Sequence, residues 1–501
     1  MKIISIDVGT SSVKAAVYDP EGRELAVSIK EYFLERPRPG WVEADPEVYW
    51  EKTRAALAEV LARTGRSEEI GAVGVASQGE TLICLDKAGA PARKALVWLD
   101  TRAVEEAHLI ESQFGAERIY RVTGQHEISP GYTASLILWL RRHEPEVFAR
   151  TSKFLLVTDY IVYKLTGRYV SHRALYPSTL YCDFQSGAWW PEMLDFLGIK
   201  AAVLPELAAS GTAAGRVRCP GLEIPAAAVV CPAPIDQVTG ALGAGNFQAG
   251  VISESTGTVL ALCGVTDTPP YDEQRRFCLF PHAIEGRFVA MPWASASGSI
   301  LAWFRDNFVP GLDYESLTAE AAAVAAGSDG LTVLPHFEGI NLPVRIVEAR
   351  GVFWGVTPSH RRGHFARAIM ESVAFLLKDY VSILEQAGIG GRQVISLGGA
   401  ARSALWSQIK ADVLEKPVVT NRVNETVCLG AAMIAAAGAG LYRDCEEACR
   451  KMVQPKRTFT PSEAAGTYRS LYGQYTRLNE LHRSFYDGLR DAPGAKEPNH
   501  G

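Results

Sequence analysis

The chain has 501 residues, of which 47% are hydrophobic, so it can bury large cores and is expected to form two or three domains. Its 51 basic and 56 acidic residues give a net charge of -5, which excludes the positive surface that nonspecific binding to nucleic acid or anionic membranes requires. We therefore expect a small-molecule substrate, with no nucleic acid and no membrane as partners, and leave a homodimer open.

The lengths of the apolar runs and the placement of the cysteines predict the cellular compartment of the protein. No apolar run approaches the roughly 20 residues of a membrane span, and Asp7 interrupts the N-terminus before a signal-peptide core could form. The nine cysteines are scattered and contain no Cys-x-x-Cys pair, which favours reduced thiols. Both observations predict a cytoplasmic protein.

The first predicted element is a hairpin, in which an apolar strand at 3–6 leads through a polar turn into a second apolar strand at 13–18. The turn contains Gly9, Thr10, Ser11 and Ser12. Its glycine lets the backbone approach a ligand closely, and its hydroxyls can donate to phosphate oxygens. Asp7 is suited to a hydrated Mg²⁺ ion, which prefers carboxylates and water. A plain hairpin without a ligand explains the same residues about equally well.

The elements that follow alternate between strands and helices. A third strand is expected at 25–29, and a helix begins at Asp45-Pro46, where Asp suits the cap and Pro the first turn. Further strands are expected at 72–76, 82–85, 96–99 and 226–231, and helices at 134–142 and 158–165. This alternation predicts an α/β fold.

Near residue 245 the pattern restarts, because 251–262 again reads strand, Gly-Thr turn, strand. The second half continues with strands at 331–335 and 394–397 and helices at 362–386, 403–415 and 425–438. We predict an N-terminal domain at 1–246 and a C-terminal domain at 247–490, with their two turns facing one another across a cleft. The tail at 491–501 is rich in Pro, Gly and charge and is expected to be disordered.

Polar residues follow several predicted strands. Asp236 and Gln237 come at the end of an apolar strand, where ligands sit in α/β sheets. Asp236 could accept the proton of a sugar hydroxyl during attack on a γ-phosphate, or it could simply cap a helix. Gly240, Gly243 and Gly245 do not have dinucleotide-binding spacing, and close helix packing explains them better.

Another polar set has the chemistry of a polyol site, namely Gln78, Glu80, Trp98, Asp100 and Arg102. Carboxylates, amides and guanidinium groups hydrogen-bond sugar hydroxyls, and an aromatic ring packs against the C–H face. The alternative is equally open for each residue: a surface Glu80, an Asp100 helix cap and a Trp98 in the core.

The segment at 396–414 predicts a strand, a Gly398-Gly399 turn and a helix. Free amides at such a helix start favour phosphate or adenosine atoms, and Ser403 can cap the helix or contact a nucleotide. A purely structural turn is the less attractive alternative, because two adjacent glycines followed by Ala-Ala leave more room than packing requires.

With these segments in this order, the chain resembles the FGGY family of carbohydrate kinases, which includes xylulokinases, ribulokinases, gluconokinases and glycerol kinases. The resemblance covers nearly the whole chain and is most specific at 398–412, which looks like the family's C-terminal signature. It implies an α/β fold of two actin-like (ribonuclease H-like) domains around a central cleft for ATP and sugar.

The resemblance also implies roles for individual residues. Asp236 would be the catalytic base, and Asp7 would help to organise Mg²⁺. Residues near the sugar would be Gln78, Glu80, Trp98, Asp100, Arg102, Asp236 and Gln237. Residues near ATP would be Thr10, Ser11, Ser12 and Lys14 in the first domain and Thr258, Gly298, Gly399 and Ser403 in the second.

Three departures from the family pattern bear on the substrate. Glycerol kinases carry Arg where this chain has Gly79, and losing that side chain is expected to enlarge the pocket. Xylulokinases typically show Met-His-Gly where this chain has Gly79-Glu80-Thr81, and the family expects Lys at Leu136. The prediction is an ATP- and Mg²⁺-dependent kinase for a pentulose-sized sugar or polyol. The alternative is an actin- or Hsp70-like ATP switch without sugar kinase activity.

Overall fold

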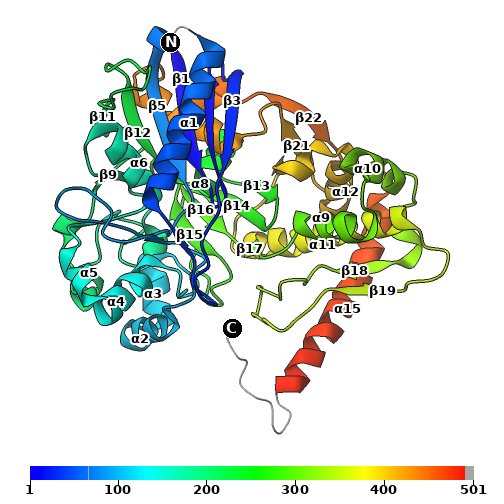
Figure 1. Cartoon of the computed structure of the whole chain (residues 1–501). Helices are drawn as coiled ribbons and strands as arrows, with labels where there is room; N and C mark the ends of the chain where they lie inside the picture. The colour runs from blue at the N-terminus through cyan, green and yellow to red at the C-terminus, as the bar shows by residue number, and fades with distance from the viewer. Residues whose placement is uncertain (66, 491–501) are drawn as a thin grey trace.

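The opening hairpin forms the centre of a six-stranded sheet. In the computed structural model, which describes residues 1–65 and 67–490, β1 (Lys2–Val8) pairs antiparallel with β2 (Ser12–Tyr18), and β2 pairs with β3 (Glu24–Glu31). On the other side, β5 (Ile70–Ser77) and β12 (Val229–Ile235) add in parallel, so the order is β11-β12-β5-β1-β2-β3 with β11 at Gly215–Arg216. Figure 1 shows this sheet among the N-terminal elements.

Alternate side chains of β1 face two different cores, as the period of two of a strand requires. Ile4 and Ile6 pack with residues of α1 (Pro46–Thr64) and α6 (Val157–Thr166). Ile3, on the other face, packs with α13 (Thr426–Gly438). As predicted, Asp45 caps α1 and accepts a hydrogen bond from the amide of Glu47. The first sheet is therefore covered on both faces.

The other N-terminal elements form a second core beside this sheet. Its helices are α2 (Val104–Phe114), α3 (Ala116–Thr123), α4 (Thr133–His143), α5 (Pro145–Arg150) and α7 (Pro191–Leu197). The short strands of this half lie between the two cores and are β4 (Glu43–Ala44), β6 (Ile83–Leu85), β7 (Ala95–Leu96), β8 (Lys153–Leu155), β9 (Val170–His172) and β10 (Glu206–Ala208). Short 3₁₀ turns lie at Ser67–Glu69, Pro177–Thr179 and Ala201–Val203. Leu136, where the family expects Lys, is fully buried in this apolar core.

The second sheet repeats the topology of the first. Its hairpin is β13 (Val251–Thr256) and β14 (Leu260–Thr266), followed by β15 (Cys278–Pro281), β16 (Phe288–Met291) and the short β17 (Trp293–Ala294). Parallel to β13 come β20 (Gln393–Leu397) and β21 (Val418–Asn421), with β22 (Pro455–Phe459) at the edge. The order β16-β14-β13-β20-β21 matches β3-β2-β1-β5-β12 of the first sheet. This match confirms the predicted pair of actin-like domains.

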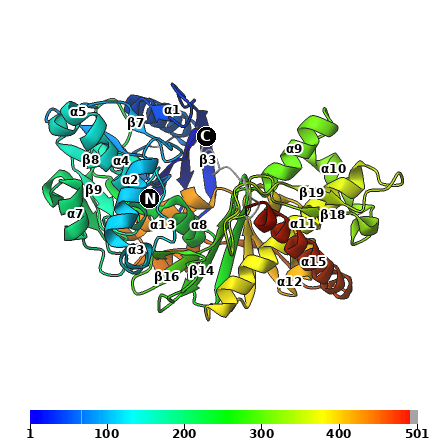
Figure 2. The same ribbon diagram turned by 90° about the horizontal axis from the view of Figure 1, so that it is seen from below.

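Helices and a small two-stranded sheet lie on the side of the second sheet that faces away from the N-terminal half (Figure 2). They are α9 (Gly298–Phe308), α10 (Tyr314–Ala322), α11 (Arg362–Gln386), α12 (Ala404–Leu414) and α15 (Ala465–Arg490), with β18 (Thr332–Leu334), β19 (Val352–Trp354) and 3₁₀ turns at Ser328–Gly330 and Gly399–Arg402. The long helix α11 has the predicted bounds.

α13 and α14 (Cys445–Met452) belong late in the chain but pack against the first sheet and α8 (Asp236–Gly243). Glycines allow the close approach, because a Cβ at Gly243 would lie 1.9 Å from the carbonyl of Thr426, and one at Gly74 would lie 2.0 Å from that of Ala431. This confirms the packing interpretation of Gly243. Figure 2 shows α13 next to α8.

Two predicted strands have different bounds. The strand expected at 96–99 ends at Leu96, because the amide of Asp100 donates to the carbonyl of Val97 and closes a turn. The strand expected at 226–231 runs instead over Val229–Ile235. It tolerates Pro232 and Pro234 because β11 pairs only with its start, so the later residues have a free edge on that side.

Three expectations concern the chain as a whole. All nine cysteines lie in the described part of the chain and are free thiols, as predicted. Within residues 1–65 and 67–490, no helix is both long and apolar enough to cross a membrane. The tail at 491–501 lies outside the described residues.

Candidate active site

Three parallel strands of the first sheet end next to one another. In the register of the sheet, Val8 of β1 lies opposite Ser77 of β5, and Ser77 lies opposite Ile235 of β12. The residues at these carboxyl ends are Asp7, Gln78, Glu80 and Asp236. The topology therefore gathers the predicted acidic and amide groups at the edge where α/β sheets bind ligands.

Asp236 is the first residue of α8 and lies just beyond its N-cap, Ile235. Its Oδ1 accepts a hydrogen bond of 2.7 Å from the amide of Gln237. Burial, followed by the charge of Asp7, raises the pKa of Asp236 to about 7. A carboxylate with such a pKa is suited to accept a proton near neutral pH.

A small cavity of about 60 Å³ lies between the two domains beside Asp236. The first domain contributes Asp236, Gln237 and Gly240, and the other lining residues are Ser253, Ser255, Ala261, Cys263, Leu397, Thr426 and Val427. The candidate base therefore faces the second hairpin across a shared space.

Asp7 is 7% exposed, and its Oδ1 is buried without a hydrogen-bond partner. Burial raises the pKa of Asp7 to about 6, although nearby Lys14 opposes the shift. A buried carboxylate oxygen without a partner is costly and marks a candidate functional site.

Lys14 crosses to the second half of the sequence. Its Nζ lies 2.6 Å from Oε2 of Glu425, the residue before α13. Burial lowers the pKa of Lys14, but the carboxylates of Asp7 and Glu425 outweigh it and raise the pKa overall. Glu425 was not predicted, because it is 411 residues from Lys14 in the sequence.

The first turn is held by hydrogen bonds that leave part of it exposed. The amide of Gly9 donates to the carbonyl of Ser12 at 2.9 Å, and the Tyr32 hydroxyl donates to the carbonyl of Gly9. The indole N–H of Trp98 donates to Oγ1 of Thr10 at 3.0 Å, and the Trp98 side chain is 38% exposed. Trp98 therefore lies over the turn instead of in the core, while Ser11 is exposed.

Gln78 and Glu80 lie at the end of β5. Both side-chain atoms of Gln78 are buried without a well-formed hydrogen bond, although the Tyr49 hydroxyl is adjacent. Burial raises the pKa of Glu80, which the Ser178 hydroxyl partly opposes. The polar atoms of Gln78 can therefore take a polar ligand as their hydrogen-bond partner.

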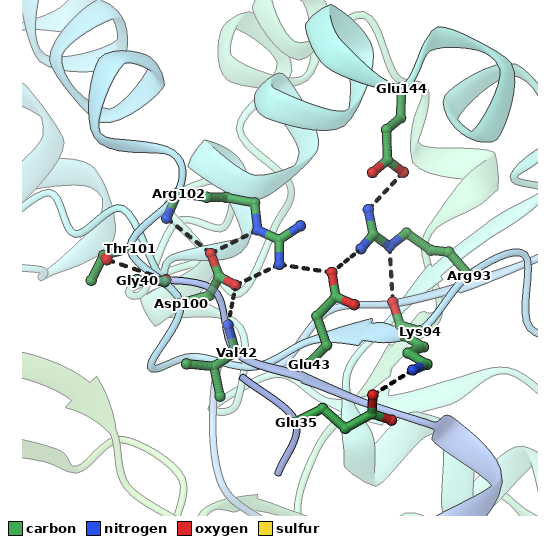
Figure 3. A network of polar contacts seen from close by, with 10 residues as sticks. All are labelled: Glu35, Gly40, Val42, Glu43, Arg93, Lys94, Asp100, Thr101, Arg102 and Glu144. Carbon is green, nitrogen blue, oxygen red and sulfur yellow. Dashed lines mark hydrogen bonds and ion pairs between the residues drawn. The ribbon is translucent and has the colours of Figure 1, made fainter. Parts of the chain in front are cut away.

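Asp100 and Arg102 bind each other (Figure 3). Asp100 is 0% exposed and accepts from the amide of Val42 and from the Arg102 guanidinium, which also reaches Glu43 at 2.8 Å and stacks 3.7 Å from the Trp41 ring centre. Asp100 does not cap a helix, and its role and that of Arg102 at a sugar stay predictions. In this structure both side chains are engaged within the first domain.

The second domain presents a turn of similar kind. Thr258 is exposed at its tip, and Ser297 donates to the carbonyl of Gly257 at 3.0 Å. Gly298 is required beneath it, because a Cβ there would lie 2.6 Å from the carbonyl of Gly257. At the next strand end Gly399 is exposed, and Ser403 caps α12 by accepting from the amide of Trp406 at 3.1 Å.

Two further findings concern the acceptor side. A Cβ at Gly79 would lie 2.9 Å from Cδ1 of Ile235, so a side chain at this position would meet Ile235. The expected enlargement of the pocket stays a prediction. Arg345 of the second domain lies 3.1 Å from Glu127 of the first. The polar run Gln125-His126-Glu127 was the only sequence signal for this contact.

Within the described residues, no group of three or more His, Cys, Asp or Glu could hold a metal alone. The unpartnered oxygen of Asp7 fits an ion that takes one or two protein carboxylates and completes its shell with water and phosphate oxygens.

The N-terminal domain model of the FGGY family of carbohydrate kinases matches residues 2–243, and the C-terminal domain model matches residues 256–439. The chain belongs to the FGGY family. It is therefore a carbohydrate kinase, a phosphotransferase with an alcohol group as acceptor, and such kinases use ATP, generally with Mg²⁺.

Individual relatives differ in their named substrates. The FGGY chain is 31% identical to xylulose kinase of Lactococcus lactis, over 94% of this chain and 95% of the relative. It is 30% identical to glycerol kinase of Methylorubrum extorquens, over 96% and 97%. The structure of xylulose kinase from Rhodospirillum rubrum, at 28% identity, covers 97% of this chain and 100% of its own with a TM-score of 0.86. These matches favour a sugar kinase over the alternative of an actin- or Hsp70-like ATP switch.

Proposed function

We propose that this kinase transfers the γ-phosphoryl group of ATP to a hydroxyl of a small neutral sugar of pentulose size, such as xylulose or ribulose. The observation that carries the proposal is Asp236, which sits among the carboxyl ends of three parallel strands and faces a cavity shared with the second hairpin. The hydroxyl oxygen attacks the γ-phosphorus, the bond to the bridging oxygen of ADP breaks, and Asp236 takes the hydroxyl proton.

The remaining residues have proposed binding roles. The first turn with Lys14 and the exposed Thr258 would bind phosphate oxygens from opposite sides. Gly298, Gly399 and Ser403 would line the nucleotide, and Asp7 would hold Mg²⁺, which would neutralise phosphate charge. The acceptor would contact Gln78, Glu80, Trp98 and Gln237. Arg102 would contribute through Nη1, which has no hydrogen-bond partner, whereas Asp100 would contribute only by leaving its present partners.

Charge supports a neutral acceptor. Glu80 and Asp236 are close enough for the charge of Glu80 to raise the pKa of Asp236. Lys14, the cation that acts on Asp236, is paired with Glu425. A carboxylate on the substrate, as in an aldonate, would meet net repulsion there.

Because the relatives include xylulose kinases and glycerol kinases, the experiment compares acceptors of both kinds. ADP release should be measured with pentuloses, hexuloses, aldonates, glycerol and larger polyols as acceptors. We expect stimulation by pentuloses, in agreement with the xylulose kinase relatives. Stimulation by glycerol alone would overturn the pentulose acceptor in favour of the one named for the glycerol kinase relative, and stimulation by none would contradict the proposed function.

The role of Asp236 makes a sharp prediction. Asp236→Asn should fold and bind nucleotide but lose about 10²- to 10⁴-fold in kcat, the usual contribution of a general base. Because burial raises the pKa of Asp236 to about 7 and only the ionised form accepts a proton, wild-type kcat/KM should fall as the pH drops below that value. Turnover by Asp236→Asn within a few-fold of wild type would contradict the assignment.

A further inference from the structure

The second hairpin rests on four buried polar side chains, Glu254, Thr256, Ser396 and Lys410, which we call the Lys410 network. Lys410 and Glu254 are both 0% exposed, and Nζ of Lys410 lies 2.6 Å from Oε1 of Glu254. Thr256 and Ser396 are 1% exposed. A charged pair this deep requires hydrogen bonds to compensate for its lost hydration.

The hydrogen bonds of the network are complete. Lys410 has three N–H donors, and they reach Oε1 of Glu254 at 2.6 Å, Oγ1 of Thr256 at 2.9 Å and Oγ of Ser396 at 3.3 Å. The Thr256 hydroxyl donates to Oε2 of Glu254 at 2.6 Å, and the Ser396 hydroxyl donates to Oε1. All three ammonium donors are engaged inside the protein. Any effect of Lys410 on a ligand must therefore act through the elements that it joins.

Those elements all lead into the candidate nucleotide site. Thr256 ends β13 and directly precedes the Gly257-Thr258 turn. Ser396 lies on β20, two residues before Gly398, whose added Cβ would lie 3.5 Å from the carbonyl of Thr256. Lys410 lies on α12, whose first turn is capped by Ser403. One ammonium group thus connects both turns with the helix.

Stability alone does not explain the network, because apolar residues of similar size often replace a buried ion pair without loss. We infer that Lys410 is a positioning residue, which fixes α12 and the 398–399 turn relative to the 256–258 turn and so sets the spacing between the two halves of the nucleotide site. This inference rests on the proposed nucleotide-binding role of these turns.

The test removes both charges together. In Glu254→Leu/Lys410→Met, the dissociation constant for Mg-ADP, measured by titration calorimetry without sugar, should rise about tenfold or more, because small displacements of binding groups are costly. The KM for the acceptor should stay near that of wild type. Thr256→Val, which keeps the ion pair but removes its bridging hydroxyl, should give a smaller rise and serves if the double variant does not fold.

The matched control is the Arg367–Glu371 pair of α11, in which Nε of Arg367 lies 2.9 Å from Oε1 of Glu371 and the side chains are 9% and 4% exposed. This pair contacts Tyr468 and not the two turns. Arg367→Met/Glu371→Leu should change the melting temperature but not the Mg-ADP dissociation constant.

The outcomes separate the two proposals. Wild-type binding of Mg-ADP by both Glu254→Leu/Lys410→Met and Thr256→Val would overturn the inference alone, as would equal losses in the control. Absence of Mg-ADP binding by the wild type would overturn the proposed function and this inference with it.

Discussion

The two hairpins share a topology but differ in where they keep their carboxylate. When the Gly9-Thr10 and Gly257-Thr258 turns are aligned, Ile6 corresponds to Glu254 and Asp7 to Ser255. Ile6 is fully buried among apolar side chains, whereas Glu254 is fully buried in the Lys410 network. Asp7, next to the first turn, leaves an oxygen without a partner.

This difference indicates that the carboxylates of the two hairpins have different roles. An unpartnered buried carboxylate lowers stability, and such groups persist where they are needed for binding or catalysis. A fully partnered carboxylate instead holds its neighbours in place. The first hairpin therefore places the Asp7 carboxylate at the cleft. The second hairpin places hydroxyl groups there and keeps its carboxylate in the buried Lys410 network.

The largest expected effect is at the second hairpin. Glu254→Gln should lower the free energy of unfolding by about 3–5 kcal/mol, because it leaves the ammonium group of Lys410 buried without its counter-charge. Urea denaturation followed by circular dichroism measures this loss. A change below about 1 kcal/mol, the size of an exposed pair, would contradict the buried network.

The same acid-to-amide change at the first hairpin should have the opposite sign. The pKa of Asp7 is about 6 in the folded protein against an ordinary value of 3.8, so folding favours its protonated form. The resulting penalty is absent below pH 3.8 and grows as the pH rises to about 6. Asp7→Asn should therefore raise the free energy of unfolding by roughly 3 kcal/mol at pH 8 and by much less at pH 4.

Denaturation of Asp7→Asn at both pH values checks this sign, with the Mg²⁺ dependence of ADP release measured in parallel. We expect the more stable protein to be the poorer enzyme. Equal stability gains at pH 4 and pH 8 would show that ionisation of Asp7 is not the cause.

The smallest effect is at Ile6. Ile6→Val removes one buried methyl group and should cost about 1 kcal/mol at every pH. The Mg-ADP dissociation constant should not change, since Ile6 holds the first hairpin by apolar packing alone. A pH-dependent loss would mean that Ile6 also shields Asp7.

Local patterns predicted much of this molecule. The two hairpins, the long helix at 362–386 and the position of Asp236 at a strand end follow from apolar periodicity and turn residues within short windows. The partners Glu425 of Lys14 and Glu43 of Arg102 could not be predicted, because they lie far away in sequence. No local pattern predicts that Glu254 and Lys410 pair, although they lie 2.6 Å apart in the folded chain.

The late helix α13 has a consequence for synthesis. It covers the face of the first sheet that contains Ile3 and Gly74, yet the ribosome makes it long after β12 is complete. The nascent N-terminal half must therefore keep this apolar face uncovered until residues 426–438 emerge. Because exposed apolar surface promotes aggregation, the chain is most vulnerable during translation, and a fragment ending at residue 246 would retain that vulnerability permanently.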